Sequence, residues 1–314
     1  MDRQQSRLIK DGFLLGAIIL AILLVTLYIP FIGYFSILLL PVPVAVFCYR
    51  YGWKSATIFS VIILLLISLF AFYFFIISLP ITLVAIIAGV FIGEALKSKR
   101  HPYEVWSRGT IGYAIGFLIL LLMIHFLSDQ SLITEYQLMI KESLDSTQLL
   151  LSKAGIELST DDIRSIEKDM MLLLDLIPSI LIMVSMLYGF VSQWLTHKVL
   201  NRFDQGQLAF PKFRSFKIPK VILTIYFFIV ILSWFNFEGL SLLGLIFFNT
   251  GLILGFLFTL QGVSFIIDLL AKRRQPKIVS VLVIIIIVVF LPLGMYLTRI
   301  LGIIDVGFNL RNKL

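Results

Sequence analysis

Charged residues and cysteine are both scarce in this sequence. Asp, Glu, Lys and Arg make up 14% of the 314 residues, whereas soluble domains typically hold about 25%. Cys48 is the only cysteine, so the chain forms no internal disulfide. The sequence also lacks a Walker-type phosphate loop, an HExxH motif and a CxxC motif. These absences argue against a soluble domain and against several common enzyme classes.

Apolar runs long enough to cross a bilayer fill the chain instead. Hydrophobic residues make up 60% of it. Residues 61–79 and 278–297 contain no charged residue, and an uncharged apolar run of about 18 residues or more is typical of a transmembrane helix. We therefore predict an all-α, polytopic integral membrane protein with eight or nine transmembrane helices, embedded in the lipid bilayer.

Nine runs are candidate spans. They are residues 12–29, 31–49, 56–78, 81–96, 109–127, 170–195, 221–235, 240–270 and 278–297. As a helix, the run 240–270 would be about 46 Å long, so it must tilt, kink or protrude from the bilayer. If one of the last runs is re-entrant, eight spans remain and the C-terminus is cytoplasmic.

The distribution of basic residues predicts the orientation. With the N-terminus in the cytoplasm, the predicted cytoplasmic segments hold 19 of the 26 Lys and Arg residues, as the positive-inside rule requires. We therefore predict a multi-pass protein of the cell membrane with a cytoplasmic N-terminus. Because these loops account for the net charge of +8, no nucleic-acid partner is expected.

One segment outside the membrane is substantial. Residues 128–169 carry nine acidic and four basic residues, which suits the outer side. Apolar residues recur at helical spacing in its first part, Gly155 can end that helix, and Ser159 to Asp162 resembles a capping box that begins another. We predict an extracytoplasmic helical hairpin. A cap lying flat on the bilayer and a lid over an outward-facing cavity are the alternatives.

This hairpin divides the predicted protein into three parts. Residues 1–127 form an N-terminal membrane region with five spans. Residues 128–169 form the amphipathic helical insertion. Residues 170–314 form a C-terminal membrane region with three or four spans.

Small residues recur at four-residue spacing, which favours close helix contacts in membranes. GxxxG pairs occur at Gly12/Gly16, Gly89/Gly93, Gly112/Gly116 and Gly251/Gly255. On the first span, Ala17 and Ala21 extend the small-residue face. We therefore predict that a membrane protein partner can dock on Gly12, Gly16, Ala17 and Ala21.

Polar side chains inside spans are the candidate ligand contacts. Asn249, Thr250 and Gln261 lie in the overlong run, and Asp175 lies in another span, three residues before Pro178. Gln261 follows Asn249 by 12 residues, which is about 1,200° around a helix. The two therefore share a cavity only if the helix breaks near Gly251–Gly255, as in many transporters. The alternative is that these side chains hydrogen-bond to neighbouring helices.

The C-terminal run from Leu301 to Arg311, LGIIDVGFNLR, carries a resemblance. Together with the order of five spans, an acidic helical insertion and further spans, it resembles the YybS-like family of bacterial membrane proteins. More distantly, the first six spans are similar to the S component of energy-coupling-factor vitamin transporters. The first helix of an S component meets a coupling subunit through AxxxA spacing, which Ala17 and Ala21 share. Three further C-terminal spans depart from that six-span plan.

The sequence offers no pair of carboxylates spaced for acid–base catalysis within the membrane. We therefore predict a non-enzymatic, transporter-like protein that binds a small molecule among its helices, without a cofactor or a metal ion. Because no nucleotide-binding motif is present, active transport would need a separate ATPase or an ion gradient. The alternative is a non-catalytic membrane scaffold that docks partners through its GxxxG faces and its acidic hairpin.

Overall fold

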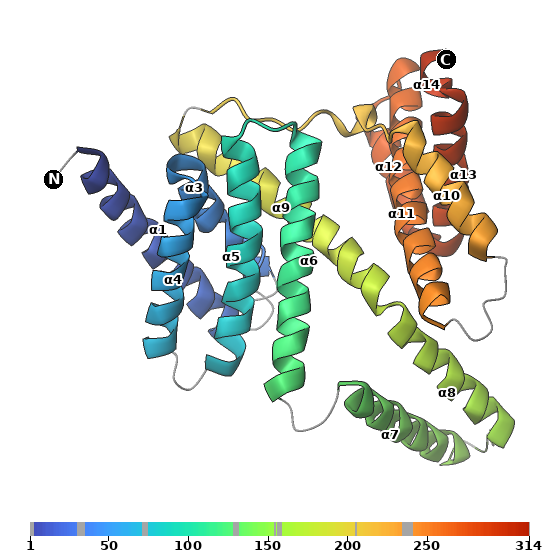
Figure 1. Cartoon of the computed structure of the whole chain (residues 1–314). Coiled ribbons are helices and arrows are strands. Elements are labelled where there is room, and N and C mark those ends of the chain that lie inside the picture. The colour runs from blue at the N-terminus through green and yellow to red at the C-terminus, as the bar shows by residue number, and fades with distance from the viewer. Residues whose placement is uncertain are drawn as a thin grey trace. The chain divides into compact units, whose positions relative to one another are not determined.

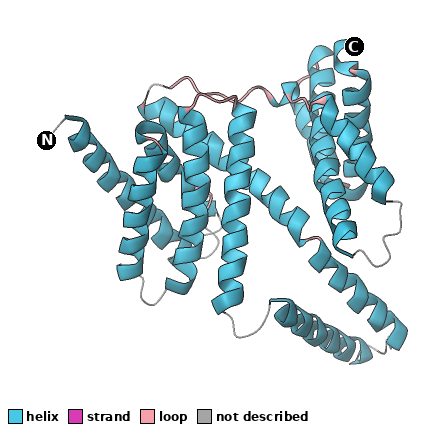
Figure 2. Cartoon of the chain, viewed as in Figure 1, coloured by secondary structure: helices cyan, strands magenta, loops and turns pink. Residues whose placement is uncertain are grey.

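The computed structural model describes residues 3–29, 35–70, 75–127, 132–153, 155, 159–204, 206–233 and 241–313 (Figure 1). Within these residues all regular structure is helical and no strand occurs, as Figure 2 shows. The predicted all-α class is therefore confirmed. The chain divides into two compact units. Unit 1 comprises Met1–Leu174 and Val184–Ala209, and unit 2 comprises Asp175–Met183 and Phe210–Leu314.

Unit 1 holds the N-terminal helices and the acidic insertion. Its helices are α1 (Arg3–Tyr28), α3 (Pro41–Tyr51), α4 (Trp53–Phe70), α5 (Phe75–Lys97), α6 (Pro102–Leu127), α7 (Leu132–Lys153) and α8 (Thr160–Asp175). The last residue of α8, Asp175, already belongs to unit 2. The first residues of α9 (Ile177–Phe203) belong to unit 2 and the remainder to unit 1. Unit 2 continues with η1 (Phe213–Ser215), α10 (Lys220–Ser233), α11 (Ser241–Lys272), α12 (Lys277–Val289), α13 (Leu291–Phe308) and α14 (Leu310–Lys313).

Six helices of the described chain are long and apolar enough to cross a membrane. They are α1, α5, α6, α9, α11 and α13, while α4, α10 and α12 are apolar but shorter. The chain is thus a membrane protein with several apolar helices. The predicted boundaries at residues 31, 128, 235 and 240 lie outside the described residues.

Several predicted spans differ from the helices that form. The run 170–195 is divided at Leu176 between α8 and α9, and α4 ends at Phe70 within the run 56–78. In the run 31–49, helix α3 has 11 residues, about 17 Å, which is too short for a hydrocarbon core of about 30 Å. The run 278–297 is not one helix, because α12 ends at Val289 and α13 begins at Leu291. Pro292 lies in the first turn of α13, where its missing N–H is tolerated. The predicted single span is therefore wrong.

The helix break that the sequence predicts in α11 does not form. Helix α11 runs without interruption from Ser241 to Lys272, so the break expected near Gly251–Gly255 is wrong. A glycine inside a helix costs only about 1 kcal/mol, which the surrounding helix tolerates. The chain breaks instead at Leu176, between α8 and α9, where Pro178 lacks the N–H that would continue the ladder.

Helices α3, α5 and α6 pack closely in unit 1. The GxxxG pair of α5 contacts α3, where a Cβ added at Gly93 would lie 2.5 Å from the carbonyl oxygen of Ala45. The GxxxG pair of α6 contacts α5, where a Cβ added at Gly116 would lie 2.9 Å from the Cα of Val84. Because neither contact leaves room for a side chain, the predicted close packing is confirmed at both pairs.

A charged cluster joins three segments at one end of unit 1. Arg50, at the end of α3, donates to both carboxylate oxygens of Asp204 at 2.7 and 3.0 Å. It also donates to Asp11 of α1 at 2.8 Å. Asp204 follows α9 directly. Three segments that the charge rule assigns to the cytoplasm therefore meet at the same end of this unit.

The acidic insertion forms the expected helices α7 and α8. Gly155, between them, has a φ of +77°, a left-handed conformation that glycine adopts readily. At the start of α8, the Asp162 N–H donates to Ser159 Oγ at 3.1 Å, and the Ser159 N–H donates to Asp162 Oδ2 at 3.2 Å. This reciprocal pair confirms the predicted capping box. The outer location of the insertion stays a prediction.

In unit 2, helices α11 and α13 touch through their backbones. A Cβ added at Gly262 would overlap the carbonyl oxygen of Thr298, and one at Gly302 would overlap that of Phe258. Helices α12 and α13 form a hairpin that brings the chain back toward the end of α11. There, Lys272 Nζ donates to the carbonyl of Arg311. The C-terminal segment therefore lies beside the C-terminal end of α11.

Candidate functional site

The four predicted ligand residues lie at two places in unit 2 rather than around one cavity. Asn249, Thr250 and Asp175 lie near the break between α8 and α9, because Asn249 bonds to the backbone there. Gln261 lies 12 residues farther along the unbroken α11, which is about 18 Å. The structure therefore does not bring Asn249 and Gln261 together.

Asn249 replaces a backbone hydrogen bond at the helix break. In a continuous helix, the Ser179 N–H would donate to the carbonyl of Asp175, four residues earlier. Here it donates to Asn249 Oδ1 at 3.0 Å, while Asn249 Nδ2 donates to that carbonyl at 2.8 Å. Asn249 is 6% exposed, so its side chain is engaged by the protein itself. It holds the break in place.

Thr250 and Asp175 have local roles. The Thr250 hydroxyl donates to the Ile246 carbonyl of its own helix at 2.6 Å. Asp175 ends α8 and contributes its backbone carbonyl to Asn249. The structure thus joins Asp175 to Asn249 through its main chain.

Gln261 belongs to a buried polar network. Its Nε2 donates to Asp305 Oδ2 at 2.6 Å, and its Oε1 accepts from the Ile218 N–H at 3.0 Å. Asp305 also accepts from Arg311, through the main-chain N–H at 3.1 Å and through Nη2 at 3.3 Å. Gln261 and Asp305 are at most 2% exposed. Each carboxylate oxygen therefore has a donor, as a buried charge requires.

Arg311 extends this network to the segment before α10. Its Nη1 donates to the carbonyls of Arg214 at 2.6 Å and Phe216 at 3.1 Å. Its Nη2 lies 3.3 Å from Ser264 Oγ. Asn309, with a left-handed φ of 52°, ends α13 and reverses the chain. The C-terminal run that carries the family resemblance therefore joins the end of α13 to α11 and to the segment before α10 through hydrogen bonds.

The sequence-based selection of site residues missed Asp305 and Arg311. They lie beyond the last predicted span, so neither was expected within the helix bundle. The available signal was the run from Leu301 to Arg311 itself, which places an acidic and a basic residue on either side of Gly307 and Asn309. Only folding brings Asp305 against Gln261 and Arg311 against Asp305.

Arg299 was also missed, because the last predicted span ended before it. It lies within α13 and its guanidinium covers Gly255 of α11, where an added Cβ would be 2.9 Å from Arg299 Cζ. In the part of the chain that the structure describes, Arg299 Nε is buried and makes no hydrogen bond. A charged group therefore lies inside the contact between two apolar helices.

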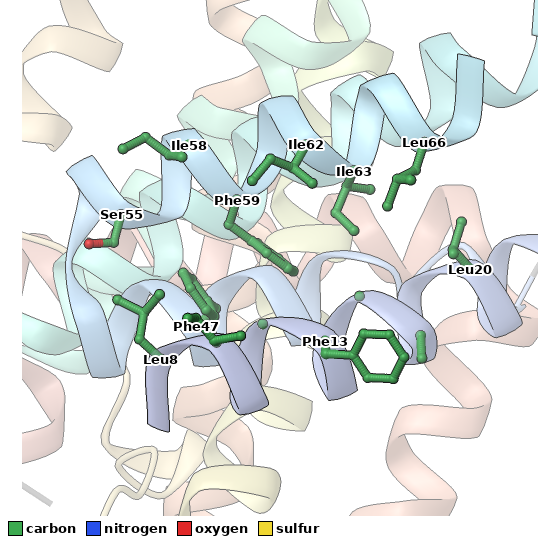
Figure 3. A pocket seen from close by; sticks show the side chains of 14 residues that line it. Leu8, Phe13, Leu20, Phe47, Ser55, Ile58, Phe59, Ile62, Ile63 and Leu66 are labelled. Carbon is green, nitrogen blue, oxygen red and sulfur yellow. The ribbon is translucent and has the colours of Figure 1, made fainter. Parts of the chain in front are cut away.

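A groove of about 520 Å³ lies between α1 and α4 in unit 1 (Figure 3). Phe59 and Ile63 reach from α4 toward α1, and the ring of Phe47 stacks on Phe59 at a centroid distance of 4.3 Å. The rim is accessible, since Phe13 is 82% exposed. The lining residues are Leu8, Ile9, Gly12, Phe13, Gly16, Ala17, Leu20, Phe47, Ser55, Ile58, Phe59, Ile62, Ile63 and Leu66. The lining is apolar except for the Ser55 hydroxyl.

The small residues of α1 divide between this groove and the outer surface. A Cβ added at Gly16 would lie 3.0 Å from Ile63 Cδ1, and one at Gly12 would lie 3.6 Å from Phe47 Cε2. Both glycines therefore face the chain's own α3 and α4. Ala17 lines the groove, whereas Ala21, one turn farther on, does not. Both alanines are exposed.

Metal-ligating side chains do not gather anywhere in the described residues. No group of three or more His, Cys, Asp and Glu side chains there could hold a metal ion.

The chain matches known proteins over nearly its whole length. The family described as "Predicted membrane protein (DUF2232)" matches residues 17–306. The chain is 28% identical over 317 residues to the Bacillus subtilis (strain 168) protein described as "Uncharacterized protein YybS", and the match covers 99% of each chain. No solved structure matches. The predicted resemblance to the YybS-like family is confirmed, while the resemblance to S components stays a prediction.

Proposed function

We propose that this chain, which belongs to the DUF2232 family of predicted membrane proteins, is a transporter-like protein that binds a small apolar molecule in the groove between α1 and α4. The observation that carries the proposal is the groove. Its volume of about 520 Å³ falls within the range of about 300–1,000 Å³ that is common for ligand sites. Its apolar lining and exposed rim suit a molecule that enters from the membrane.

The chemistry of the groove limits what it can select. Lipid tails are as apolar as the lining, so burying a hydrophobic ligand there gains little over leaving it in the bilayer. Selectivity must then come from shape. The stacked rings of Phe47 and Phe59 form a rigid floor, and a rigid ligand loses less conformational entropy on binding than a flexible acyl chain. We therefore propose a compact, rigid apolar ligand, bound without chemical conversion.

The polar residues of α11 support this choice indirectly. A ligand that used the amides of Asn249 or Gln261 would have to displace hydrogen bonds that those side chains already make within the protein. Each buried polar group left without a partner costs about 1–3 kcal/mol. A role for Asn249, Thr250, Gln261 and Asp175 as ligand contacts stays a prediction, and it ranks below the groove.

A membrane scaffold is the second candidate, because the same helix offers an alternative surface. Ala17 and Ala21 are exposed on α1, and small residues at this spacing let a partner helix approach closely. In this function, a transmembrane helix of another protein would cover α1, and Gly12 and Gly16 would act by keeping α1 close to α3 and α4.

A pair of matched substitutions separates the two functions. Ala17→Trp places a large ring in the groove, whereas Ala21→Trp adds the same ring one turn away, outside the lining. The probe is a photoactivatable, diazirine-bearing sterol, offered to the full chain in detergent micelles. Ligand binding predicts that Ala17→Trp abolishes labelling of groove peptides while Ala21→Trp labels like the parent. Equal labelling of both variants, or labelling spread at random over the protein, would contradict ligand binding in the groove.

The scaffold function predicts another pattern. Native mass spectrometry of protein extracted gently from cells should then show a stoichiometric second chain that both substitutions remove. Loss of such a partner from both variants, with no groove labelling in the parent, would favour the scaffold over the ligand-binding function.

Orientation is a further part of the proposal. The charge rule supports a cytoplasmic N-terminus, and the α12–α13 hairpin supports a C-terminus on the same side as the loop after α11. In a Cys48→Ala background, a cysteine at Ser146 should react with an impermeant maleimide in intact cells, and one at Arg274 only after permeabilisation. A Ser146 cysteine that resists labelling would reverse the orientation.

A further inference from the structure

Arg299 has an unusual position for a charged residue. Helix α13 runs from Leu291 to Phe308 and is long and apolar enough to cross a membrane. Arg299 lies eight residues after its start and nine before its end, so each end is about 12–14 Å away. A charge near the middle of a membrane helix is expensive unless it is paired or solvated, and such residues usually serve a function.

Arg299 has no counter-charge among the described residues. None of the ion pairs among the described residues involves this guanidinium. Its Nε is buried without a hydrogen-bond partner in that same part of the chain. The absence of a side chain at Gly255 makes room for the guanidinium of Arg299, because a Cβ there would lie 2.9–3.2 Å from three atoms of that group.

Arg311 differs from Arg299 in having a counter-charge, although its Nε is likewise buried without a hydrogen-bond partner among the described residues. It pairs with Asp305 and donates to two backbone carbonyls. Near Arg299, the hydroxyl of Thr259 is already engaged, since it donates to the Gly255 carbonyl at 3.0 Å. Unit 2 thus contains one arginine whose two terminal nitrogens have acceptors, Arg311, and one whose guanidinium has no acceptor among the described residues, Arg299.

We propose that Arg299 binds an anionic group, a phosphate or a carboxylate, at the contact between α11 and α13. The guanidinium carries a permanent positive charge and presents donors in a planar fork that matches both anions. The anion comes either from the headgroup of a lipid or from a soluble molecule. This site is separate from the apolar groove of unit 1 and does not depend on it.

The test uses the full chain in nanodiscs of pure phosphatidylcholine. In one arm, phosphatidylglycerol replaces part of the phosphatidylcholine; in the other, inorganic phosphate or acetate is titrated into the buffer. The melting temperature is measured in both, and native mass spectrometry counts retained phosphatidylglycerol. A rise with phosphatidylglycerol alone identifies a lipid, and a rise with a free anion identifies a soluble ligand. If none of the three anions raises the melting temperature of the parent, the proposal is wrong.

Substitutions then assign the effect to this site. Arg299→Gln should weaken anion binding about tenfold or more, since a hydrogen bond to a charged group contributes about 1.5–3 kcal/mol. Arg299→Lys keeps the charge and should retain part of the binding. Arg274→Gln, which removes an exposed charge outside the helices, should bind like the parent. Equal losses in Arg299→Gln and Arg274→Gln would reduce the effect to general surface charge and overturn the proposal.

A glycine pair keeps the proposal testable if Arg299→Gln fails to fold. Gly255→Ala pushes the guanidinium aside without removing its charge. Gly251→Ala, one turn earlier on α11, meets only Ile229 at an ordinary 3.6 Å. We expect weaker anion binding in Gly255→Ala and parental binding in Gly251→Ala. Parental binding in both would show that the anion does not use Arg299.

Discussion

The two compact units are built from the same kind of apolar helix but differ in how many buried apolar side chains hold them together. In unit 1, buried apolar side chains from α1, α3, α4, α5, α6 and α9 form one cluster, and the Arg50 ion pairs lie at its end. In unit 2, backbone touches backbone at Gly262 and Gly302, and buried polar side chains cross between the helices. Its described buried apolar residues are Phe216, Ile218, Tyr226, Ile229, Phe258, Phe265 and Val306.

The difference shows two ways of fixing helices in a bilayer. Apolar side chains alone distinguish poorly between a neighbouring helix and lipid, so unit 1 also depends on its close glycine contacts, which reach backbone atoms of α3 and α5. A polar contact forms in only one register, so unit 2 depends on which donor meets which acceptor. We therefore expect both units to be sensitive to volume added at their glycine contacts, and unit 2 to be the more sensitive to the loss of single polar groups.

The largest effect should come from breaking the network of unit 2. Asp305→Ala removes the counter-charge of the largely buried Arg311 and the acceptor of the Gln261 amide. Removing one partner of a buried ion pair costs about 3–5 kcal/mol, so the detergent-solubilised protein should melt at a much lower temperature. The control is Asp268→Ala, since Asp268 pairs with a Lys272 that is 41% exposed. Similar melting of both variants would remove the distinction between buried and exposed pairs.

A smaller loss should follow from one added methyl group between α11 and α13. In Gly262→Ala, the new Cβ overlaps a backbone carbonyl, which cannot rotate away, so we expect a loss of about 3 kcal/mol, the upper part of the usual range for overpacking. The unit 1 counterpart, Gly112→Ala, meets atoms at 3.0 Å and should lose less. Gly112→Leu and Gly116→Leu should destabilise unit 1 clearly. A lower melting temperature for Gly112→Ala than for Gly262→Ala would contradict this ranking.

The ion pairs of unit 1 should matter less. Arg50→Gln removes contacts to Asp11 and Asp204, but these side chains are 23–32% exposed. Exposed pairs contribute about 0–1 kcal/mol and are screened by salt. We expect a small drop in melting temperature at low ionic strength that shrinks in high salt. A drop as large as that of Asp305→Ala would show that unit 1 also depends on its polar contacts.

The smallest effect concerns the acidic insertion of unit 1. Hydrogen bonds from the Ser159 hydroxyl and N–H hold the pKa of Asp162 below its ordinary value of 3.8. A lowered pKa means that the capping box is stabilising above the ordinary pKa and is lost as the pH falls through the lower one. Hydrogen exchange at the start of α8, corrected for intrinsic rates, should accelerate at that pH. In Asp162→Asn this pH dependence should disappear.

Several local features follow from the sequence because their causes are local. Ser159 and Asp162 form a capping box through groups three residues apart. The Gly112/Gly116 pair marks a close contact because a helix brings residues four apart to one face. Asn249 and Gln261 were correctly placed on α11. A cavity shared by the two required a helix break, which glycine alone does not impose, and α11 is unbroken.

By itself, the sequence determined the class of the protein: long uncharged apolar runs must be helices in a bilayer, because their backbone groups have no water to bond. It also determined the capping box and the glycine faces. Only the tertiary structure decided that the last run folds into a hairpin and that Gln261 meets Asp305, 44 residues away. Only the tertiary structure placed the guanidinium of Arg299 over Gly255. A polar side chain in a membrane helix needs a partner, but the partner's identity depends on which helices become neighbours.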